Sequence, residues 1–259
     1  MISGGRPTTQ RCLVKVSESK CLSFDYFGSC LGRFDMTDSS VHSITLRHDG
    51  AFGRPNQAFG KNGLNAKILL AGCSRLYHLE LTGFFADAIF RSSRGPQIPQ
   101  LILLKRLDLC WSYHGCNGGA ILKLLHVMPS LESIKIDVQQ GGRDDYDFDS
   151  VESVPPCIAC HLNEVVFVGF EGRRQEVKLA DFLLKNGVGL KKMLGLSRDK
   201  SSERRAQREF WDRLRGAYQM GDLELGPSDA DEFGGLGVSS FTYCMQIVVV
   251  VMYAFALHC

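Results

Sequence analysis

The chain has 259 residues, of which 44% are hydrophobic and 22% are charged, a composition that is typical of a globular protein and excludes a disordered one. Its formal net charge of +2 is too small to favour binding to nucleic acid or to an acidic membrane surface. Residues 1–10 are polar and Gly-rich, and no apolar stretch of a signal peptide follows them. We therefore expect the ten cysteines to be buried free thiols in the cytoplasm or the nucleus.

An apolar pattern of the form L-x-x-L-x-L recurs along the chain. A weak copy at Leu22–Phe24 is followed by a clearer one at Val41–Ile44–Leu46. The four strongest copies are Leu76–Leu79–Leu81, Leu104–Leu107–Leu109, Leu131–Ile134–Ile136 and Leu162–Val165–Phe167. They start 28, 27 and 31 residues apart, close to the period of about 20–29 residues that is typical of leucine-rich repeats.

This spacing has a structural cause. Residues two apart on a strand share one face, so the second and third apolar positions of each copy enter a core together. One strand cannot bury that face alone, whereas stacked copies form a parallel sheet with a continuous core. A lone copy would fit an open α/β sheet, but four copies at a near-constant period favour an α/β leucine-rich-repeat solenoid, a parallel sheet with helical or irregular connectors.

The connecting segments agree with this interpretation. Ile121, Leu124 and Leu125 fall on one face of a helix, which Pro129 ends just before the next strand. A residue three positions before each copy is expected to face the core as well; these residues are Cys73, Leu101, Met128 and Ala159. The Asn or Cys that is typical of the ninth repeat position is replaced by Phe84, Ser112, Gln139 and Phe170, so we expect connecting loops of variable shape.

A more specific signature occupies residues 161–193, which read HLNEVVFVGFEGRRQEVKLADFLLKNGVGLKKM. The pattern predicts a strand, a Gly-containing turn, a helix and the start of another strand. Glu176 falls in the first turn of the helix, where the helix dipole favours a carboxylate. Asn186 and Gly187 are typical of a helix C-terminus.

This signature resembles the FBD module found at the C-terminus of plant F-box/leucine-rich-repeat proteins. The matching segments are HLNEVVFVGFEG, the helix ending in FLLKNG and the closing LKKM. Upstream, LLAGCSRLYHLEL and HVMPSLESIKI resemble the repeat strands of the same family, so the similarity covers about residues 61–196.

The resemblance implies a function in recognition. Members of this family typically act as substrate receptors of SCF-type ubiquitin ligases, in which an F-box binds the Skp adaptor and the repeats select a target protein. No segment before Leu22 resembles the Leu-Pro-rich F-box. We therefore expect this chain to recognise an unidentified target protein and not to bind Skp by itself.

Two cysteine motifs could carry chemistry. Cys157, Cys160 and His161 match the haem-attachment pattern C-x-x-C-H, but haem attachment requires an oxidising export route that the N-terminus does not offer. The same cysteine pair could form half of a zinc site, which Cys110, His114 and Cys116 would complete only with irregular spacing. We interpret these thiols as structural and expect neither metal nor cofactor.

The remaining motifs do not support enzymatic activity. Asp145, Asp147 and Asp149 alternate as in a calcium loop, but Ser150 and Pro156 replace the required Gly and Glu, which indicates a solvated acidic loop. The chain has no G-x-S-x-G, P-loop or H-E-x-x-H motif. We expect no enzyme and no catalytic, cofactor-binding or metal-binding residue, and the partner-binding residues stay unassigned.

The C-terminal part differs from the repeats. Residues 201–215 predict a helix rich in arginine, and residues 247–257 are wholly apolar but too short to span a bilayer core of about 30 Å. Alternatives to the receptor function are therefore a scaffold anchored in a membrane through 241–259, or a truncated relative without a ligase role. The expected division is a leucine-rich-repeat region over 10–155 with weak repeats before 61, an FBD-like module over 156–196, a charged helix over 197–217, a flexible linker over 218–240 and an apolar tail over 241–259.

Overall fold

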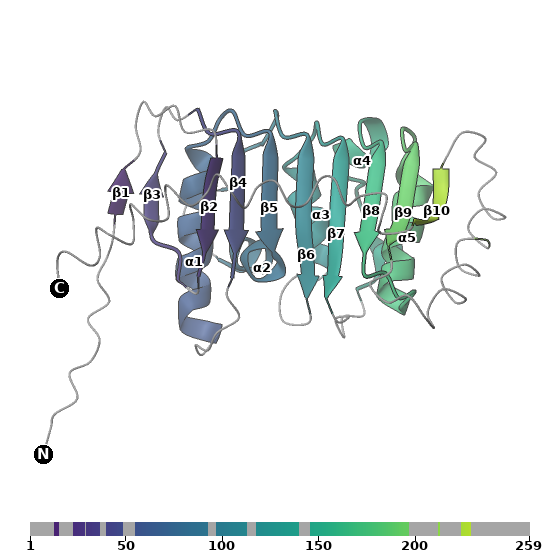
Figure 1. Ribbon diagram of the computed structural model, residues 1–259, viewed down its shortest axis with the longest axis horizontal. Coiled ribbons are helices and arrows are strands. Elements are labelled where there is room, and N and C mark those ends of the chain that lie inside the picture. The colour runs from purple at the N-terminus through teal and green to yellow at the C-terminus, as the bar shows by residue number, and fades with distance from the viewer. Residues whose placement is uncertain are drawn as a thin grey trace, which may run out of the picture.

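The protein is built around one large parallel sheet (Figure 1). The computed structural model describes residues 13–15, 23–28, 30–36, 40–48, 55–92, 97–112, 118–139, 146–196, 212 and 224–228. Its eight strands lie in the order β10-β9-β8-β7-β6-β5-β4-β2, and every neighbouring pair is parallel. The strands are β2 (Ser23–Phe27), β4 (Ser43–Arg47), β5 (His78–Thr82), β6 (Arg106–Ser112), β7 (Ser133–Gln139), β8 (Glu164–Val168), β9 (Lys192–Leu196) and β10 (Glu224–Ser228).

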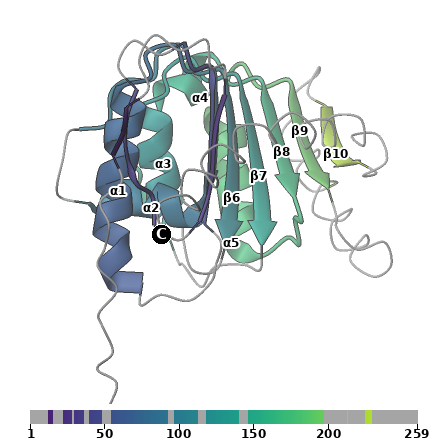
Figure 2. The same ribbon diagram turned by 60° about the vertical axis from the view of Figure 1, so that its left-hand side comes forward.

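The described helices all lie on one face of this sheet, as Figure 2 shows from the side. They are α1 (Pro55–Ala71), α2 (Gly83–Arg91), α3 (Gly118–His126), α4 (Pro156–Cys160), α5 (Arg174–Asn186) and the 3₁₀ turn η1 (Phe148–Ser150). Strands β1 (Leu13–Lys15) and β3 (Arg33–Asp35) form a separate parallel pair. The large sheet therefore has an inward face toward the helices and an outward face that none of the described helices covers.

The strand register follows the apolar pattern of the sequence. Leu79 pairs with Leu107, Leu107 with Ile134, and Ile134 with Val165. The third apolar positions of the copies pair in the same way. They form a second row two residues further along each strand. The weak N-terminal copies are strands as well, because Phe24 pairs with Ile44 and Ile44 with Leu79. The prediction of an α/β fold with a parallel sheet is confirmed.

The first apolar position of each strong copy lies just before its strand and is fully buried. Leu76 is 1% exposed and Leu104, Leu131 and Leu162 are each 0% exposed. Burial of such a side chain contributes about 1.5–3 kcal/mol to folding, so each of the repeated leucines stabilises the core. These residues join the core cluster together with helix residues such as Leu125.

The structure corrects two details of the sequence interpretation. Ala159 is only half-buried, and Ile158 is buried in its place, because Pro155 and Pro156 begin helix α4 and change the phase of the chain before β8. The expected linker 218–240 includes strand β10, which extends the sheet beyond β9.

The expected helix 197–217, apart from residue 212, and the expected tail 241–259 lie outside the described residues. In the described part of the chain, no helix is both long enough and apolar enough to cross a membrane.

Candidate protein-interaction surface

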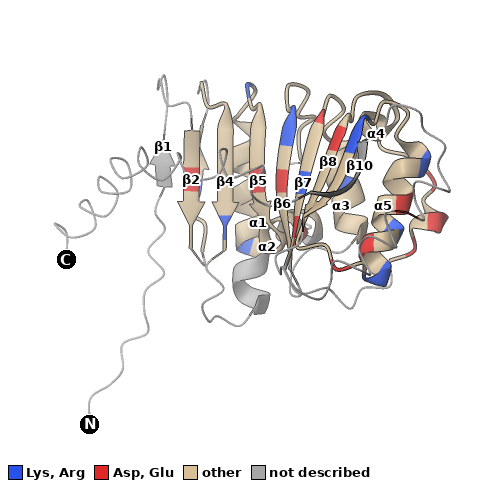
Figure 3. Cartoon of the chain, turned by 45° about the vertical axis from the view of Figure 1, so that its right-hand side comes forward, with Lys and Arg blue, Asp and Glu red and all other residues tan. Residues whose placement is uncertain are grey.

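The outward face of the sheet carries the side chains that the core does not use. Because side chains alternate along a strand, the sequence neighbours of the buried leucines project from the opposite face. Over β4 to β9 these outward residues are Ser43, Thr45, Arg47, His78, Glu80, Thr82, Arg106, Asp108, Cys110, Ser133, Lys135, Asp137, Glu164, Val166, Val168, Lys192, Leu194 and Leu196. Figure 3 shows that both basic and acidic residues occur along these strands.

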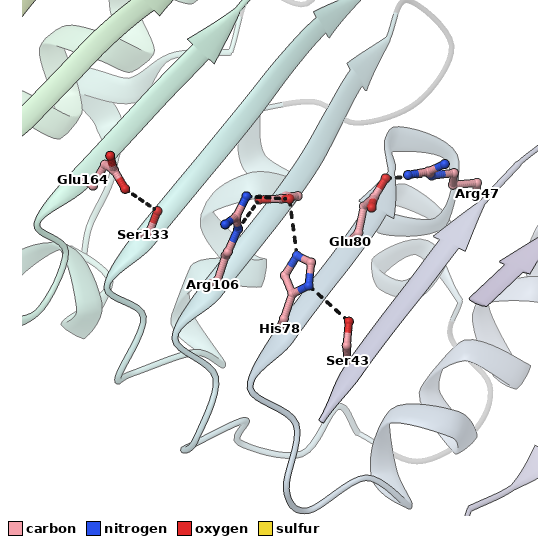
Figure 4. Close-up of polar contacts among 8 residues, drawn as sticks. Ser43, Arg47, His78, Glu80, Arg106, Ser133 and Glu164 are labelled. Carbon is pink, nitrogen blue, oxygen red and sulfur yellow. Dashed lines mark hydrogen bonds and ion pairs between the residues drawn. The ribbon is translucent and has the colours of Figure 1, made fainter. Parts of the chain in front are cut away.

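A polar network crosses three strands of this face where β4, β5 and β6 begin. His78 on β5 lies between β4 and β6: its Nδ1 is 3.1 Å from Ser43 Oγ, and its Nε2 is 3.3 Å from Asp108 Oδ2. Arg106 donates two hydrogen bonds to the Asp108 carboxylate, from Nε at 3.1 Å and from Nη2 at 3.3 Å. Figure 4 shows His78 with its ring toward Ser43 and Arg106 on the next strand. In the parallel register, Ser43, His78 and Arg106 lie in one row across the strands. Asp108 lies in the next row on the same face.

Further pairs tie the same face together on either side of this network. Arg47 Nε on β4 donates to Glu80 Oε1 on β5 at 2.7 Å. Ser133 Oγ on β7 donates to Glu164 Oε2 on β8 at 3.1 Å (Figure 4). Each contact joins neighbouring strands, so outward side chains are held in defined positions across β4 to β6 and, separately, across β7 and β8.

Neighbouring groups shift the pKa values of three charged side chains on this face. Burial of the Asp108 carboxylate acts to raise its pKa, but the contacts with His78 and Arg106 outweigh burial and lower that pKa below its ordinary value. The hydrogen bond to Asp108 raises the pKa of Arg106, and the hydrogen bond to Glu80 raises the pKa of Arg47. Asp108, Arg106 and Arg47 are therefore ionised at neutral pH.

The outward face changes character at β8 and β9. Glu164 and Lys192 begin these strands, but the outward positions that follow are the apolar residues Val166, Val168, Leu194 and Leu196. Three of them are buried although they point away from the helices: Val166 is 8% exposed, Leu194 is 3% and Leu196 is 8%. The outward face over β8 and β9 is therefore more hydrophobic than the face that carries the charged network.

The turn between β8 and α5 is organised by one carboxylate. Glu176 Oε2 accepts backbone hydrogen bonds from Glu171 at 2.8 Å, Gly172 at 2.9 Å and Arg173 at 3.3 Å. Gly172 has a φ of +76°, which favours glycine. Burial raises the pKa of Glu176, while these N–H donors oppose the shift. The role expected for Glu176 at the helix start is thus extended to fixing the preceding loop.

The residues of the cysteine motifs are not gathered into one site. Cys157 is fully buried, its Sγ donates to the Leu125 carbonyl at 3.5 Å, and burial raises its thiol pKa to about 12. Cys160 is exposed. His114 and Cys116 lie outside the described residues, and within the described ones no group of three or more His, Cys, Asp or Glu side chains is placed to hold a metal ion. These observations support the structural interpretation of Cys157.

The acidic loop is described only in part. Asp147 Oδ1 accepts a hydrogen bond from the Asp149 backbone N–H at 3.2 Å, which caps the short turn η1. Asp145 lies outside the described residues.

Sequence reasoning left the outward network unassigned. His78 was a lone histidine in the sequence, and no motif links it to Ser43 or Asp108, which lie 35 and 30 residues away. The usable signal was the repeat itself. Aligned copies of L-x-x-L-x-L place the x positions of successive strands side by side, and this alignment gives the row His78, Arg106, Ser133 and Glu164.

Comparison with known proteins gives a consistent result. The model of the FBD family matches residues 150–194. The chain is 31% identical over 96 residues to a putative F-box/FBD/LRR-repeat protein of Arabidopsis thaliana, a match that covers 36% of this chain and 21% of the relative. It is 35% identical over 79 residues to a putative FBD-associated F-box protein of the same plant, covering 27% of this chain and 18% of the relative.

The matched part of the chain thus spans about a fifth of the length of these curated relatives. No solved structure matches the chain. The resemblance found in the sequence is confirmed at modest identity: residues 150–194 match the FBD family model, and part of the chain is similar to plant F-box/FBD/LRR-repeat proteins.

Proposed function

We propose that this chain is a leucine-rich-repeat solenoid that recognises a target protein through the outward face of strands β4 to β7. The observation that carries the proposal is the network of Ser43, His78, Asp108 and Arg106 on a sheet face that none of the described helices covers. The proposed activity is binding, without a catalytic step.

The physical basis is pre-organisation. Each side chain that is fixed before binding avoids an entropic cost of about 0.5–1.5 kcal/mol when the partner arrives. A rigid sheet with cross-strand contacts supplies such fixed side chains, and a mixed pattern of charges discriminates between partners more than it adds affinity. A solenoid presents this pattern over an extended surface without a deep pocket.

Both relatives are named as putative F-box proteins, which supports a more specific role. We propose that the recognised target is a substrate delivered to an SCF-type ubiquitin ligase, with this chain as the recognition portion. The FBD module would extend the array on its C-terminal side, since its strands β8 and β9 continue the same sheet.

Affinity purification from plant cells, followed by mass spectrometry, tests the recognition face. The tagged protein would carry Glu80→Lys together with Lys135→Glu, two changes on the outward face. The matched control is Lys123→Glu, an exposed residue of α3 on the helix side. We expect the specifically enriched proteins to be lost from the double variant and kept by the control. Equal recovery with all three proteins would refute recognition by this face.

The ligase role has its own readout. With the proteasome inhibited, ubiquitin-ligase subunits should co-purify with the wild-type protein, and ubiquitinated forms of its target should accumulate. Recovery of targets without any ligase subunit would refute the ligase role and leave recognition intact.

A further inference from the structure

A recurring turn leads the chain into several strands of the sheet. In three copies the backbone N–H of the fourth turn residue donates to the carbonyl of the first: Leu104 to Leu101 at 3.1 Å, Leu131 to Met128 at 3.2 Å, and Leu190 to Gly187 at 3.2 Å. The segment from Cys73 to Leu76 takes the same place before β5. The copies provide an internal reference for which residues this turn requires.

One copy departs from the others at its two central residues. The central pairs are Ser74–Arg75, Pro129–Ser130 and Val188–Gly189, and each contains at least one residue type that turns favour. The copy before β6 has Ile102–Leu103 instead, with Ile102 58% exposed and Leu103 48% exposed. Branched aliphatic residues have no turn preference, and the core does not use these two side chains. Neither local structure nor packing accounts for them.

The backbone of a third exposed apolar residue, Tyr77, lies beside the chain that leaves this turn. A ladder of carbonyls runs along the same edge of the sheet, each accepting two N–H groups from the next strand entry. The residues of this ladder are His42, Tyr77, Lys105, Glu132 and Asn163. Tyr77 accepts from Lys105 at 2.9 Å and from Arg106 at 3.1 Å, which places it next to the segment that follows Leu103. It is the aromatic exception in this polar row and is 54% exposed.

The charge nearest this patch that has no carboxylate partner among the described residues is basic. Arg75 is exposed in the turn just before Tyr77, whereas Arg106, which belongs to the outward network, is paired with Asp108. Lys105 lies close by and is paired with Glu132 at 2.6 Å. Figure 3 shows the basic end of β6. An occupant with carboxylates beside its apolar residues would therefore complement the rim.

We propose that Tyr77, Ile102 and Leu103 form a docking site, separate from the outward sheet face, for a short peptide segment of a partner protein that carries a branched aliphatic or aromatic residue flanked by acidic residues. Exposed apolar residues that occur singly are normal, and Val188, 87% exposed on the same edge, is one of them. Three neighbouring ones with a basic rim mark an interaction site instead.

A random twelve-residue peptide library displayed on phage provides a defined probe. The full chain is the bait, and selected peptides are then synthesised and their affinity is measured by fluorescence anisotropy. The test variant is Ile102→Ser with Leu103→Ser, which copies the serines at positions 74 and 130. The matched control is Val188→Ser. Both variants change exposed side chains, so their unfolding midpoints should equal that of the wild type.

We expect selected peptides to contain an aliphatic or aromatic residue next to Asp or Glu. Their affinity should fall at least about tenfold, equivalent to about 1.4 kcal/mol, with the double variant and stay unchanged with Val188→Ser. A Glu80→Lys variant should bind them like the wild type, which separates this site from the proposed recognition face. The proposal is overturned if no peptide is enriched, if the enriched peptides are basic, or if they bind the double variant equally well.

Discussion

The outward sheet face over β4 to β7 and the same face over β8 and β9 share one backbone arrangement but differ in chemistry. Both regions bury their inward residues, such as Leu107 and Val165, completely. On the outward side, β4 to β7 carry paired charges, whereas β8 and β9 carry Val166 and Leu194, which are buried. Folding therefore dictates the inward pattern in both regions, and the outward pattern varies with what each region contacts.

The largest expected effect separates the two regions directly. Replacing Leu194 by Asn places a polar amide in apolar surroundings at a position that is 3% exposed. This change should lower the free energy of unfolding by about 3 kcal/mol. Lys135→Asn, at an exposed outward position on β7, should change it by less than about 0.5 kcal/mol. Urea denaturation followed by circular dichroism measures both. Equal losses would show that the two regions do not differ in burial.

The next effect concerns the loop that Glu176 organises. Glu176→Ala removes the acceptor of three backbone N–H groups and should cost about 2 kcal/mol. Glu176→Gln keeps a carbonyl acceptor but removes the buried charge. It should lower the free energy of unfolding clearly less, because burial already disfavours the ionised form of Glu176. Denaturation of both variants gives the comparison. A glutamine variant as unstable as the alanine one would contradict this account of the loop.

A smaller effect on stability is expected in the outward network, and this effect depends on pH. Asp108→Asn should lower the free energy of unfolding by about 1 kcal/mol at pH 7, since it weakens the contacts with Arg106 and His78. The folded pKa of Asp108 lies below its ordinary value of 3.8, so its stabilisation is present above that pH and is lost as pH falls through the folded pKa. Measured between pH 7 and pH 3, the difference between wild type and variant should shrink only at the acidic end. A constant difference would argue against the ionised contact.

The smallest effect should come from the exposed pair of Arg47 and Glu80. The Arg47 side chain is 48% exposed, and solvent screens such pairs, so Arg47→Gln should cost at most about 0.5 kcal/mol. If the pair serves recognition, the same variant should weaken partner binding more than it weakens folding. Thermal denaturation and binding measured on one sample distinguish these effects.

The repeat pattern was sufficient to predict the parallel sheet, because Leu79, Leu107 and Ile134 occupy equivalent places in strands that must bury one face. The sequence does not predict strand β10, because Gly226 and Pro227 disfavour strands. The sheet accommodates Pro227 because β10 lies at its edge, where proline is tolerated. The repeat period also does not predict that Ile158 is buried in place of Ala159 before β8, because it does not reveal that Pro156 starts a helix.

The candidate site was less accessible to sequence reasoning. Contacts such as that of His78 with Asp108 depend on which outward positions are brought side by side, and therefore on the register between β5 and β6. The exposed turn at Ile102–Leu103 is conspicuous only after the equivalent turns have been superimposed by their hydrogen bonds. The repeat period predicts which residues the core buries, whereas the proposed function rests on residues that the core does not use.

The central claim is that the outward face of β4 to β7 contacts the partner. Site-specific photo-crosslinking in plant cells tests it most directly, with the photoreactive amino acid p-benzoylphenylalanine placed at Lys135 on β7 or at Lys123 on α3; both positions are exposed, on opposite sides of the sheet. The account predicts a crosslinked partner from position 135 and none from position 123. A crosslink from position 123 alone would contradict it.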